Sequence, residues 1–391
     1  MPLVASLGIA QIVSWGTLFY AIGVLGPAMR ADLGASELFL FGSFTAGLLV
    51  SGTLAPIAGR LIDARGGRFV LSLGSGAGFI AMAILAVAPN PAVMAAGWLV
   101  AGAAMSSCLY DPAFATLSQH AGSRYRSAVT ALTLFGGFAS TVFWPVSHLL
   151  LHAWGWREAF GIYAALHLCV CLPIHLRVPR HAQVPHPDGL DTPRQASHSS
   201  AFSDPRLRWL TASFALVAFI VGVVAIHMIE LLTTAGLTAA QAVTVAMLVG
   251  PMQVAGRIVV FAFAGRVRVT RLGVTAFTLI LLSLVALISV NGLGAAAILF
   301  VTVYGAGNGV LTIVRGTTPA ELFGRDGLGS VLGHLSRAGL YSTAIAPAAY
   351  SMLLTLGLTR TSAVATLMAV ALGAMGSYAI AVRSAPATRA A

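Results

Sequence analysis

The chain alternates long apolar runs with short polar stretches along nearly its whole length. A helix of about 20 mostly apolar residues is long enough to cross a bilayer. Twelve such runs occur, at 3–29, 37–61, 69–88, 93–118, 127–151, 158–176, 209–233, 239–264, 272–290, 293–316, 327–354 and 361–382. The first run lacks a basic start and eleven similar runs follow it, so we interpret it as a span and not as a cleaved signal peptide. The pattern predicts an all-α membrane protein with twelve transmembrane helices.

A polar stretch divides the runs into two sets of six. Residues 177–208 are rich in Pro, His, Ser and Arg and show no apolar period, which is typical of a connecting segment. We therefore predict a six-helix bundle over 1–176, a linker over 177–208 and a second six-helix bundle over 209–391.

Short motifs recur in the two halves in the same order, offset by about 200 residues. A duplicated six-helix unit explains such a recurrence. The matched segments are Gly34-Ala-Ser36 with Gly236-Leu-Thr238, Ala58-Gly59-Arg60 with Ala255-Gly256-Arg257, and Ser140-Thr141 before Pro145 with Ser342-Thr343 before Pro347.

The composition excludes a soluble protein. Of 391 residues, 58% are hydrophobic and only 8% are charged, with a mean hydropathy of +0.90, whereas soluble domains carry about 25% charged residues. The net charge of +11 does not indicate a nucleic-acid partner, because the bases are all arginine and most of them cluster in short loops between apolar runs. The three cysteines lie inside apolar runs and are interpreted as packing residues. We expect no metal and no cofactor.

The arginines predict the orientation. With the N-terminus in the cytoplasm, the opposite side holds only Arg30, Arg157 and Arg360, and every other loop arginine falls on the cytoplasmic side. Basic loops remain in the cytoplasm. We expect a plasma-membrane protein, the inner membrane of a bacterium, with both termini cytoplasmic. The cytoplasmic set comprises Arg60, Arg65, Arg68, Arg124, Arg126, Arg266, Arg268, Arg271, Arg325, Arg383, Arg389 and the arginines of the linker.

A loop motif follows the second run. Gly59, Asp63, Arg65, Gly66 and Arg68 stand in the sequence GRLIDARGGR. Glycines let helices and a tight turn approach closely, and an aspartate can cap a helix end or pair with an arginine. The motif resembles the loop signature G-x-L-x-D-x-x-G-x-R/K of the major facilitator superfamily; the alternative is an ordinary basic loop.

The resemblance implies two six-helix bundles with a substrate site between them at the membrane midplane. It also implies alternating access, with the loop latching the outward-facing state at the cytoplasmic side. We expect a monomer whose partners are the lipid bilayer and a small-molecule substrate, with no nucleic acid.

Two departures bear on the branch of the family. Drug/proton antiporters typically carry a basic residue in the fourth span and a glycine pattern around a proline in the fifth. Here the fourth run has no basic residue, and the fifth keeps Pro145 without that pattern. The first run, with Trp15 and Tyr20, is weakly similar to that of monocarboxylate and oxalate/formate porters.

Polar residues inside the eleventh run predict a substrate site. His334, Arg337 and Tyr341 share one helical face with Ser330. Arg337 follows Asp326 by eleven residues, about 16 Å along a helix, and charges at such depth usually face a cavity or a partner. Arg337 is therefore interpreted as an anion contact or as a structural partner of Asp111. The oxalate/formate porters also use a basic residue in this span.

Other spans carry further candidate substrate contacts. Tyr304 and Asn308 share a face in the tenth run, and Gln253 lies beside Pro251 in the eighth. These side chains can hydrogen-bond a substrate or join neighbouring helices. Trp15 and Tyr20 are candidates for an aromatic wall, with simple packing as the alternative.

Two carboxylates are candidates for proton coupling. Asp111 precedes Pro112, which cannot donate a backbone hydrogen bond, so we expect a local helix break there. Its alternative role is a fixed ion pair. Glu230 lies three residues after His227, and this pair is interpreted as an outer gate, a proton site or an interfacial pair. His148 and His152 have metal-compatible spacing but no third ligand near them in sequence, which favours interfacial histidines.

These observations favour a secondary active transporter over an enzyme. No run holds a nucleophile beside a base, and no phosphate-binding loop is present. Arg337 and His334 favour a small organic anion such as a monocarboxylate as the substrate. The alternative is proton-coupled efflux of drug-like amphiphiles or cations.

Overall fold

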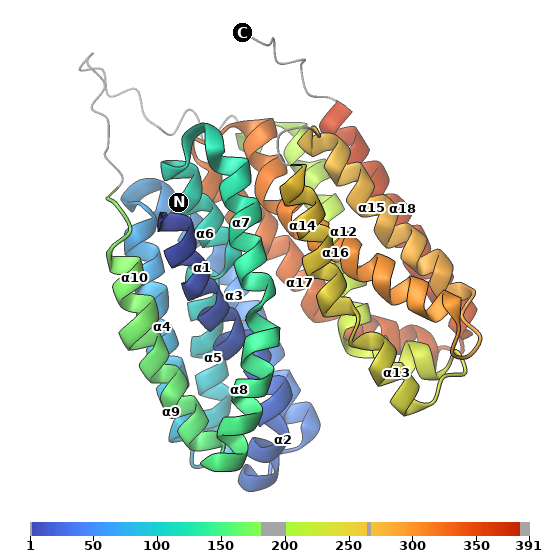
Figure 1. The fold of residues 1–391 in the computed structure, drawn as a ribbon, viewed down its shortest axis with the longest axis horizontal. Helices are drawn as coiled ribbons and strands as arrows, with labels where there is room; N and C mark the ends of the chain where they lie inside the picture. Colours follow the sequence, from blue (N-terminus) through green and yellow to red (C-terminus); the bar gives the residue numbers. More distant parts are fainter. Residues whose placement is uncertain (1, 181–200, 264–266, 384–391) are drawn as a thin grey trace. The chain divides into compact units, whose positions relative to one another are not determined.

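The computed structural model describes residues 2–180, 201–263 and 267–383, and within these ranges the regular structure is helical throughout (Figure 1). The predicted all-α fold is confirmed. Most of the predicted linker, residues 181–200, lies outside the described part of the chain, as do residues 384–391. The helices of the first half are α1 (Pro2–Trp15), η1 (Gly16–Tyr20), α2 (Ala21–Leu33), α3 (Glu37–Arg65), α4 (Gly67–Ala86), α5 (Pro91–Cys108), α6 (Tyr110–His120), η2 (Gly122–Arg124), α7 (Tyr125–Gly137), α8 (Ala139–Ala153), α9 (Trp156–Leu166), η3 (His167–Cys171) and α10 (Leu172–Leu176).

The second half begins again with a long helix and contains fewer interruptions. Its helices are α12 (Pro205–Thr233), α13 (Ala239–Ala246), α14 (Val249–Ala262), α15 (Val269–Ile288), α16 (Ala295–Phe323), α17 (Leu328–Thr355) and α18 (Arg360–Arg383).

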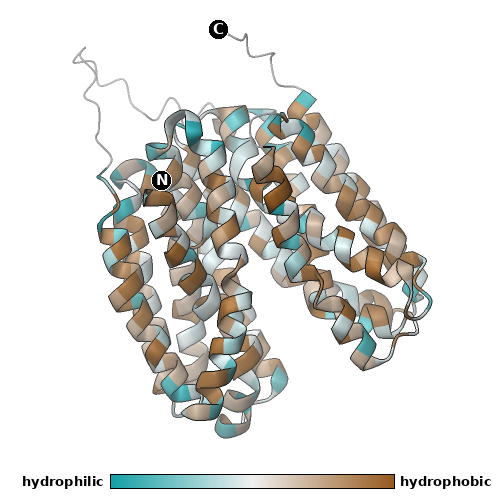
Figure 2. Ribbon diagram, in the orientation of Figure 1, coloured by the Kyte–Doolittle hydropathy of each residue, from teal (hydrophilic) through white to brown (hydrophobic). Residues whose placement is uncertain are grey.

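The helices correspond to the twelve predicted spans. In the described ranges, 11 helical segments are long and apolar enough to cross a membrane. Figure 2 shows apolar residues along their lengths and hydrophilic residues gathered near the helix ends. The twelfth span is α17, which has 28 residues and is long enough. It is less apolar than the others because polar residues, including His334 and Arg337, lie within it.

The chain forms two compact units, which we call the N-terminal unit and the C-terminal unit. The N-terminal unit consists of α1 to α10 together with Gly324–Arg337, which includes the start of α17. There α5 packs against α3 and α4, α9 against α4, and α1 against α7. The C-terminal unit consists of Ala201–Phe323 and the chain from Ala338 onward, and there α16 packs against α14 and α15 while α18 packs against α12. The division at 1–176, 177–208 and 209–391 stays a prediction.

Helix breaks occur next to two of the prolines within the spans. Leu109 is extended between α5 and α6, which confirms the break expected near Asp111. Pro112 then occupies the third position of α6, where its missing N–H costs nothing because the first turn has no carbonyl partners. Pro251 takes the same position in α14, after the break that ends α13. Each proline therefore sits where a new helix begins.

The first repeated motif forms the same cap in both halves. Gly34 and Gly236 have φ values of 63° and 93°, which glycine adopts without strain. The Ser36 side chain then accepts a hydrogen bond from the Phe39 N–H (3.1 Å) at the start of α3. Thr238 caps α13 in the same way, through the Gln241 N–H (3.3 Å). The capping predicted from the sequence is confirmed.

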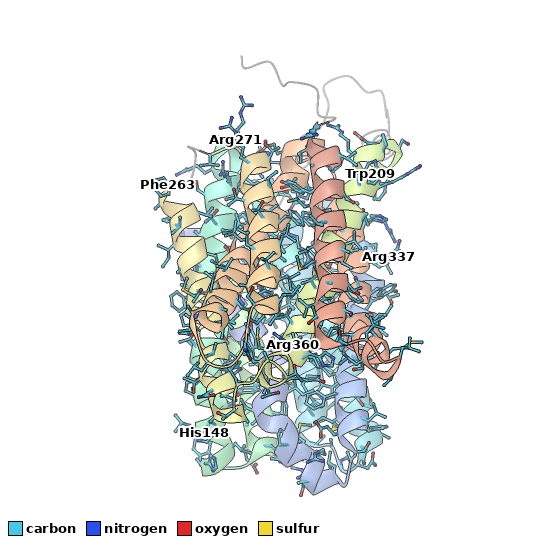
Figure 3. All side chains as sticks on the ribbon, turned by 90° about the vertical axis from the view of Figure 1, so that its right-hand side faces the viewer. His148, Trp209, Phe263, Arg271, Arg337 and Arg360 are labelled. Atoms are coloured by element: carbon cyan, nitrogen blue, oxygen red, sulfur yellow. The ribbon has the colours of Figure 1, made fainter. Side chains whose placement is uncertain are left out.

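A second repeated feature became visible only in the structure. Arg157, near the start of α9, donates to the Ala88 carbonyl (3.1 Å) just beyond α4 and pairs with Asp32. Arg360, at the start of α18, donates to Leu287 (2.6 Å) and Val290 (3.3 Å) at the end of α15. Each guanidinium donates to carbonyls at or just beyond the C-terminal end of a helix, where a basic side chain is favourable. In Figure 3, Arg271 and Arg360 mark opposite ends of the C-terminal unit.

Candidate functional site

The loop motif places Asp63 at the start of α17. Its carboxylate accepts hydrogen bonds from the N–H groups of Gly329 (2.9 Å) and Ser330 (2.7 Å) and from the Ser330 hydroxyl (2.6 Å). These N–H groups belong to the first turn of α17, where no carbonyl of the helix itself can accept them. A negative charge at a helix N-terminus also interacts favourably with the helix dipole. Asp63 therefore caps a helix that lies more than 260 residues further along the chain.

Glycine at position 59 allows α3 and α17 to touch backbone to backbone. A Cβ atom on Gly59 would lie 2.0 Å from the carbonyl oxygen of Gly329, and a Cβ on Gly329 would lie 2.5 Å from that of Gly59. No larger side chain fits at either position without moving the backbone. Of the two roles expected for Asp63, the structure shows helix capping, and within the described ranges it shows no ion pair of Asp63 with an arginine.

The rest of the motif shapes the turn. Gly66 joins α3 to α4 with a φ of 83°, a conformation that favours glycine. The Arg65 guanidinium lies over the Phe69 ring, 5.2 Å from its centroid. Arg68 is half-buried in the first turn of α4.

Two side chains outside the predicted motif hold this region. Gln119, at the end of α6, donates to the Ile62 carbonyl (2.9 Å) and accepts from the Gly67 N–H (3.2 Å), so it clamps both sides of the turn. Arg325 donates to the Gly122 carbonyl. A lone glutamine near the end of a span gives no recognisable signal, and Arg325 was read only as a cytoplasmic charge.

An aromatic cluster lies within the N-terminal unit and contains both predicted aromatic residues. The Trp15 ring lies 5.0 Å from that of Tyr110, and the Tyr20 ring lies 6.2 Å from that of Trp144. Gln11, which is fully buried, accepts from the Trp15 indole (3.2 Å) and donates to the Cys108 carbonyl (2.7 Å). That carbonyl ends α5 at the break, so Gln11 satisfies the broken helix and orients Trp15.

Asp111 lies in the first turn of α6, half-buried and next to this cluster. The partial positive charge of the helix N-terminus favours a carboxylate at this position. The alternative role of Arg337, a pair with Asp111, is not formed in the described structure, since Arg337 makes no hydrogen bond or ion pair there.

In the C-terminal unit, the candidates of the eighth and tenth spans meet along α14 and α16. A Cβ on Gly309 would lie 2.2 Å from the Gln253 carbonyl oxygen, so the two backbones touch. Asn308 is half-buried, whereas Tyr304 is only 3% exposed and is part of the core. The structure thus brings Gln253 and Asn308 into one region and places Tyr304 inside the packing.

A buried arginine lies at the same helix pair. Arg257 is 4% exposed, and its guanidinium donates to the Gly309 carbonyl (3.4 Å) and the Thr312 hydroxyl (3.5 Å). Its repeat counterpart Arg60 is exposed. The repeat motif identified the position of Arg257 but gave no sign that it is buried.

The four residues predicted to share one face of α17 differ in how deeply they are buried. Ser330 is buried against Asp63, His334 and Tyr341 are half-buried, and Arg337 is exposed. Figure 3 shows the Arg337 side chain projecting outward from its helix. These residues share a helix. Among them, Arg337 carries a charge that makes no hydrogen bond or ion pair in the described structure.

His227 and Glu230 form a pair near the end of α12. The imidazole Nδ1 lies 2.6 Å from the Glu230 carboxylate, and Nε2 lies 3.3 Å from the Pro347 carbonyl oxygen on α17. His227 is 9% exposed, whereas half of the Glu230 side chain is exposed. His148 and His152, by contrast, are both exposed on α8, with ring centroids 4.3 Å apart.

An acid outside the spans caps α12. The Asp204 carboxylate accepts hydrogen bonds from the Arg206 guanidinium (2.6–3.0 Å) and from the Arg206 backbone N–H (2.8 Å). These bonds favour the charged carboxylate and lower the pKa of Asp204.

Comparison with known proteins agrees with this architecture. The solved structure of the transporter FucP in its outward conformation has a TM-score of 0.75 at 15% identity, covering 97% of this chain and 98% of that chain. The human organic anion transporter MFSD10 (TETRAN) has a TM-score of 0.72 at 16% identity, covering 96% and 98%. At these identities the likeness concerns the fold.

In sequence, the multidrug resistance protein MdtL of Citrobacter koseri is 29% identical over 175 residues, and this match spans 43% of the MdtL length. The family model of the Major Facilitator Superfamily matches residues 7–347. Twelve spans, a loop motif that caps α17 and a match over most of the chain agree, and the chain belongs to the Major Facilitator Superfamily of membrane transporters.

Proposed function

We propose that this transporter moves a small organic anion, such as a monocarboxylate, by alternating access. The observation that carries the proposal is Arg337. It lies nine residues into α17, about 14 Å along the helix, and makes no hydrogen bond or ion pair in the described structure. A guanidinium within a membrane helix needs a partner, and a substrate carboxylate would supply one through a bidentate contact.

The other proposed substrate contacts lie in both units. His334 stands one turn before Arg337 on α17, and Tyr341 one turn after it. Gln253 and Asn308 offer amides along α14 and α16, and Trp15 and Tyr20 offer aromatic rings. Tyr304 is kept as a candidate only for a state in which its buried hydroxyl becomes accessible. Asp111 and Glu230 are the carboxylates proposed to take part in proton coupling.

Drug efflux is the second candidate function. It is favoured by the likeness to MdtL, whose name describes multidrug resistance. The lack of a basic residue in the fourth span and of the glycine pattern in the fifth stands against it.

A thermal-shift panel separates the two functions. Purified protein is heated with monocarboxylates, dicarboxylates and drug-like cations in turn, since a ligand that binds the folded state raises the melting temperature. We expect an increase of about 2 °C or more with at least one carboxylate. Stabilisation by cations alone would favour drug efflux and overturn the anion proposal.

The proposed orientation places both termini and the linker in the cytoplasm of a bacterium. The turn η2, between α6 and α7, then faces the cytoplasm and the loop after α4 faces outward. The arginine distribution supports this orientation.

Cysteine labelling tests the orientation. In a variant without its three native cysteines, Val87→Cys should react with an impermeant thiol reagent in intact cells, and Ser123→Cys should react only after permeabilisation. Both positions are exposed, so they differ in the side of the membrane they occupy. The reverse pattern would invert the topology.

A further inference from the structure

Both nitrogens of the His227 ring lie close to hydrogen-bond acceptors. Its Nε2 atom faces the carbonyl oxygen of Pro347 at 3.3 Å, and a backbone carbonyl only accepts hydrogen bonds. Nδ1 faces the Glu230 carboxylate at 2.6 Å, and an ionised carboxylate also only accepts. A neutral imidazole has a single N–H and can satisfy only one of these two oxygens. Both contacts are hydrogen bonds only if the pair holds one proton more than a neutral ring beside a carboxylate.

Other neighbours favour placing this proton on the ring. The Tyr350 ring lies 4.9 Å from the imidazole, and an aromatic ring close to a cation stabilises it. The Glu230 side chain is half exposed, so its ionised form keeps part of its hydration. The carboxylate and the imidazolium then form a charge-assisted hydrogen bond.

The charged groups around the pair come from few elements. Arg360 of α18 is close enough for its charge, like that of Glu230, to act on Tyr350 of α17. The helix α13 carries no titratable side chain. On α16, Tyr304 is buried in the core, and Arg315 and Glu321 lie towards the far end of that helix.

We propose that His227 binds a proton from solution as an imidazolium, with Glu230 as its counter-ion, and that this proton ties α12 to α17 beside Pro347. When the proton leaves to solvent past the exposed carboxylate, the ring keeps one N–H. The Glu230 charge draws that N–H to Nδ1, and the bond to the Pro347 carbonyl is lost. Only the coupling of this step to substrate movement rests on the proposed transport function.

The hydrogen bond from His227 to the Pro347 carbonyl affects α17 because of where it lies along that helix. Pro347 lacks an N–H, so the preceding turn of α17 misses one helical hydrogen bond and bends easily. Two hydroxyl bonds also join the helices, from Ser342 to the Ala215 carbonyl (2.6 Å) and from Thr343 to the Ala218 carbonyl (3.3 Å). Neither of those bonds titrates. Proton loss therefore releases only the segment of α17 that follows the bend.

The proton is observed directly by nitrogen NMR of the full chain in lipid vesicles, with ¹⁵N-labelled histidine and no substrate. The resonances of His227 are those missing from His227→Gln. If that variant does not fold, they are those that move in Glu230→Gln and not in Glu158→Gln, an exposed glutamate of the N-terminal unit. At pH 6 we expect both ring nitrogens of His227 to carry protons. Glu230→Gln should reduce the doubly protonated fraction at least fivefold, and Glu158→Gln should leave it unchanged.

A singly protonated ring at pH 6 would overturn the inference, as would equal effects of the two glutamate variants or no moving resonance. Hydrogen exchange of residues 348–355 tests the tie. After correction for intrinsic rates, protection should fall at least fivefold from pH 6 to pH 8 in the wild type and stay low at both pH values in Glu230→Gln. Equal protection in all cases would refute the tie. Because no substrate is used, failure of the anion proposal would leave these results unaffected.

Discussion

Replacing Asp63 by asparagine should reduce transport about tenfold or more while leaving the amount of folded protein nearly unchanged. The carboxylate accepts three hydrogen bonds at the start of α17, and bonds to a charged group contribute about 1.5–3 kcal/mol each. Asparagine keeps one oxygen as a helix cap, so folding is preserved. It loses the charge and turns an NH₂ group towards N–H donors. The conformation in which α3 holds α17 then loses its advantage, and its population falls.

The measurement is uptake into proteoliposomes of the ligand found by the thermal-shift panel, together with the melting temperature. Asp32→Asn is the matched control, because it removes an aspartate that pairs with Arg157 elsewhere in the same unit. Its transport should stay within twofold of the wild type. Ser330→Ala removes one of the three bonds and should have an intermediate effect. Normal transport by Asp63→Asn would show that the motif serves only as an ordinary basic loop.

Apolar run length predicted the spans well because the bilayer sets the length of a helix within narrow limits. Helix ends such as Glu37 of α3 and Thr233 of α12 coincide with those expected. Helix caps and helix breaks were also predictable, because they depend on residues that are close together in the sequence. The break before Pro112 and the caps at Ser36 and Thr238 depend on residues within one turn of each other.

Contacts between distant segments were not readable from one sequence. The motif identified Asp63 but offered two partners, and only the fold shows that the carboxylate meets the backbone at Ser330. Arg60 and Arg257 stand in the same repeated motif, yet one is exposed and the other is buried. Helix periodicity gives the face of a residue but not the helix it will meet. For that reason Gln119 was missed.

Arg337→Gln should weaken binding of anionic ligands by roughly tenfold to a hundredfold, since a hydrogen bond to a charged group is worth about 1.5–3 kcal/mol. Arg337→Lys should recover only part of this loss, because lysine keeps the charge but not the planar pair of donors. Both variants should stay monodisperse in detergent, since Arg337 has no hydrogen bond or ion pair to lose in the described structure. The readout is the ligand concentration that half-saturates the thermal shift.

Arg360→Gln is the matched control, because it removes a guanidinium that donates to the Leu287 and Val290 carbonyls. It should lower the melting temperature of the protein without ligand and leave anion affinity within about twofold. If Arg337→Gln instead lowers stability, and Asp111→Asn in the same chain restores it with binding intact, Arg337 is a structural partner of Asp111 in another state of the transporter. An anion site would then have to be built on a different cation, and drug efflux would become the better explanation of the likeness to MdtL.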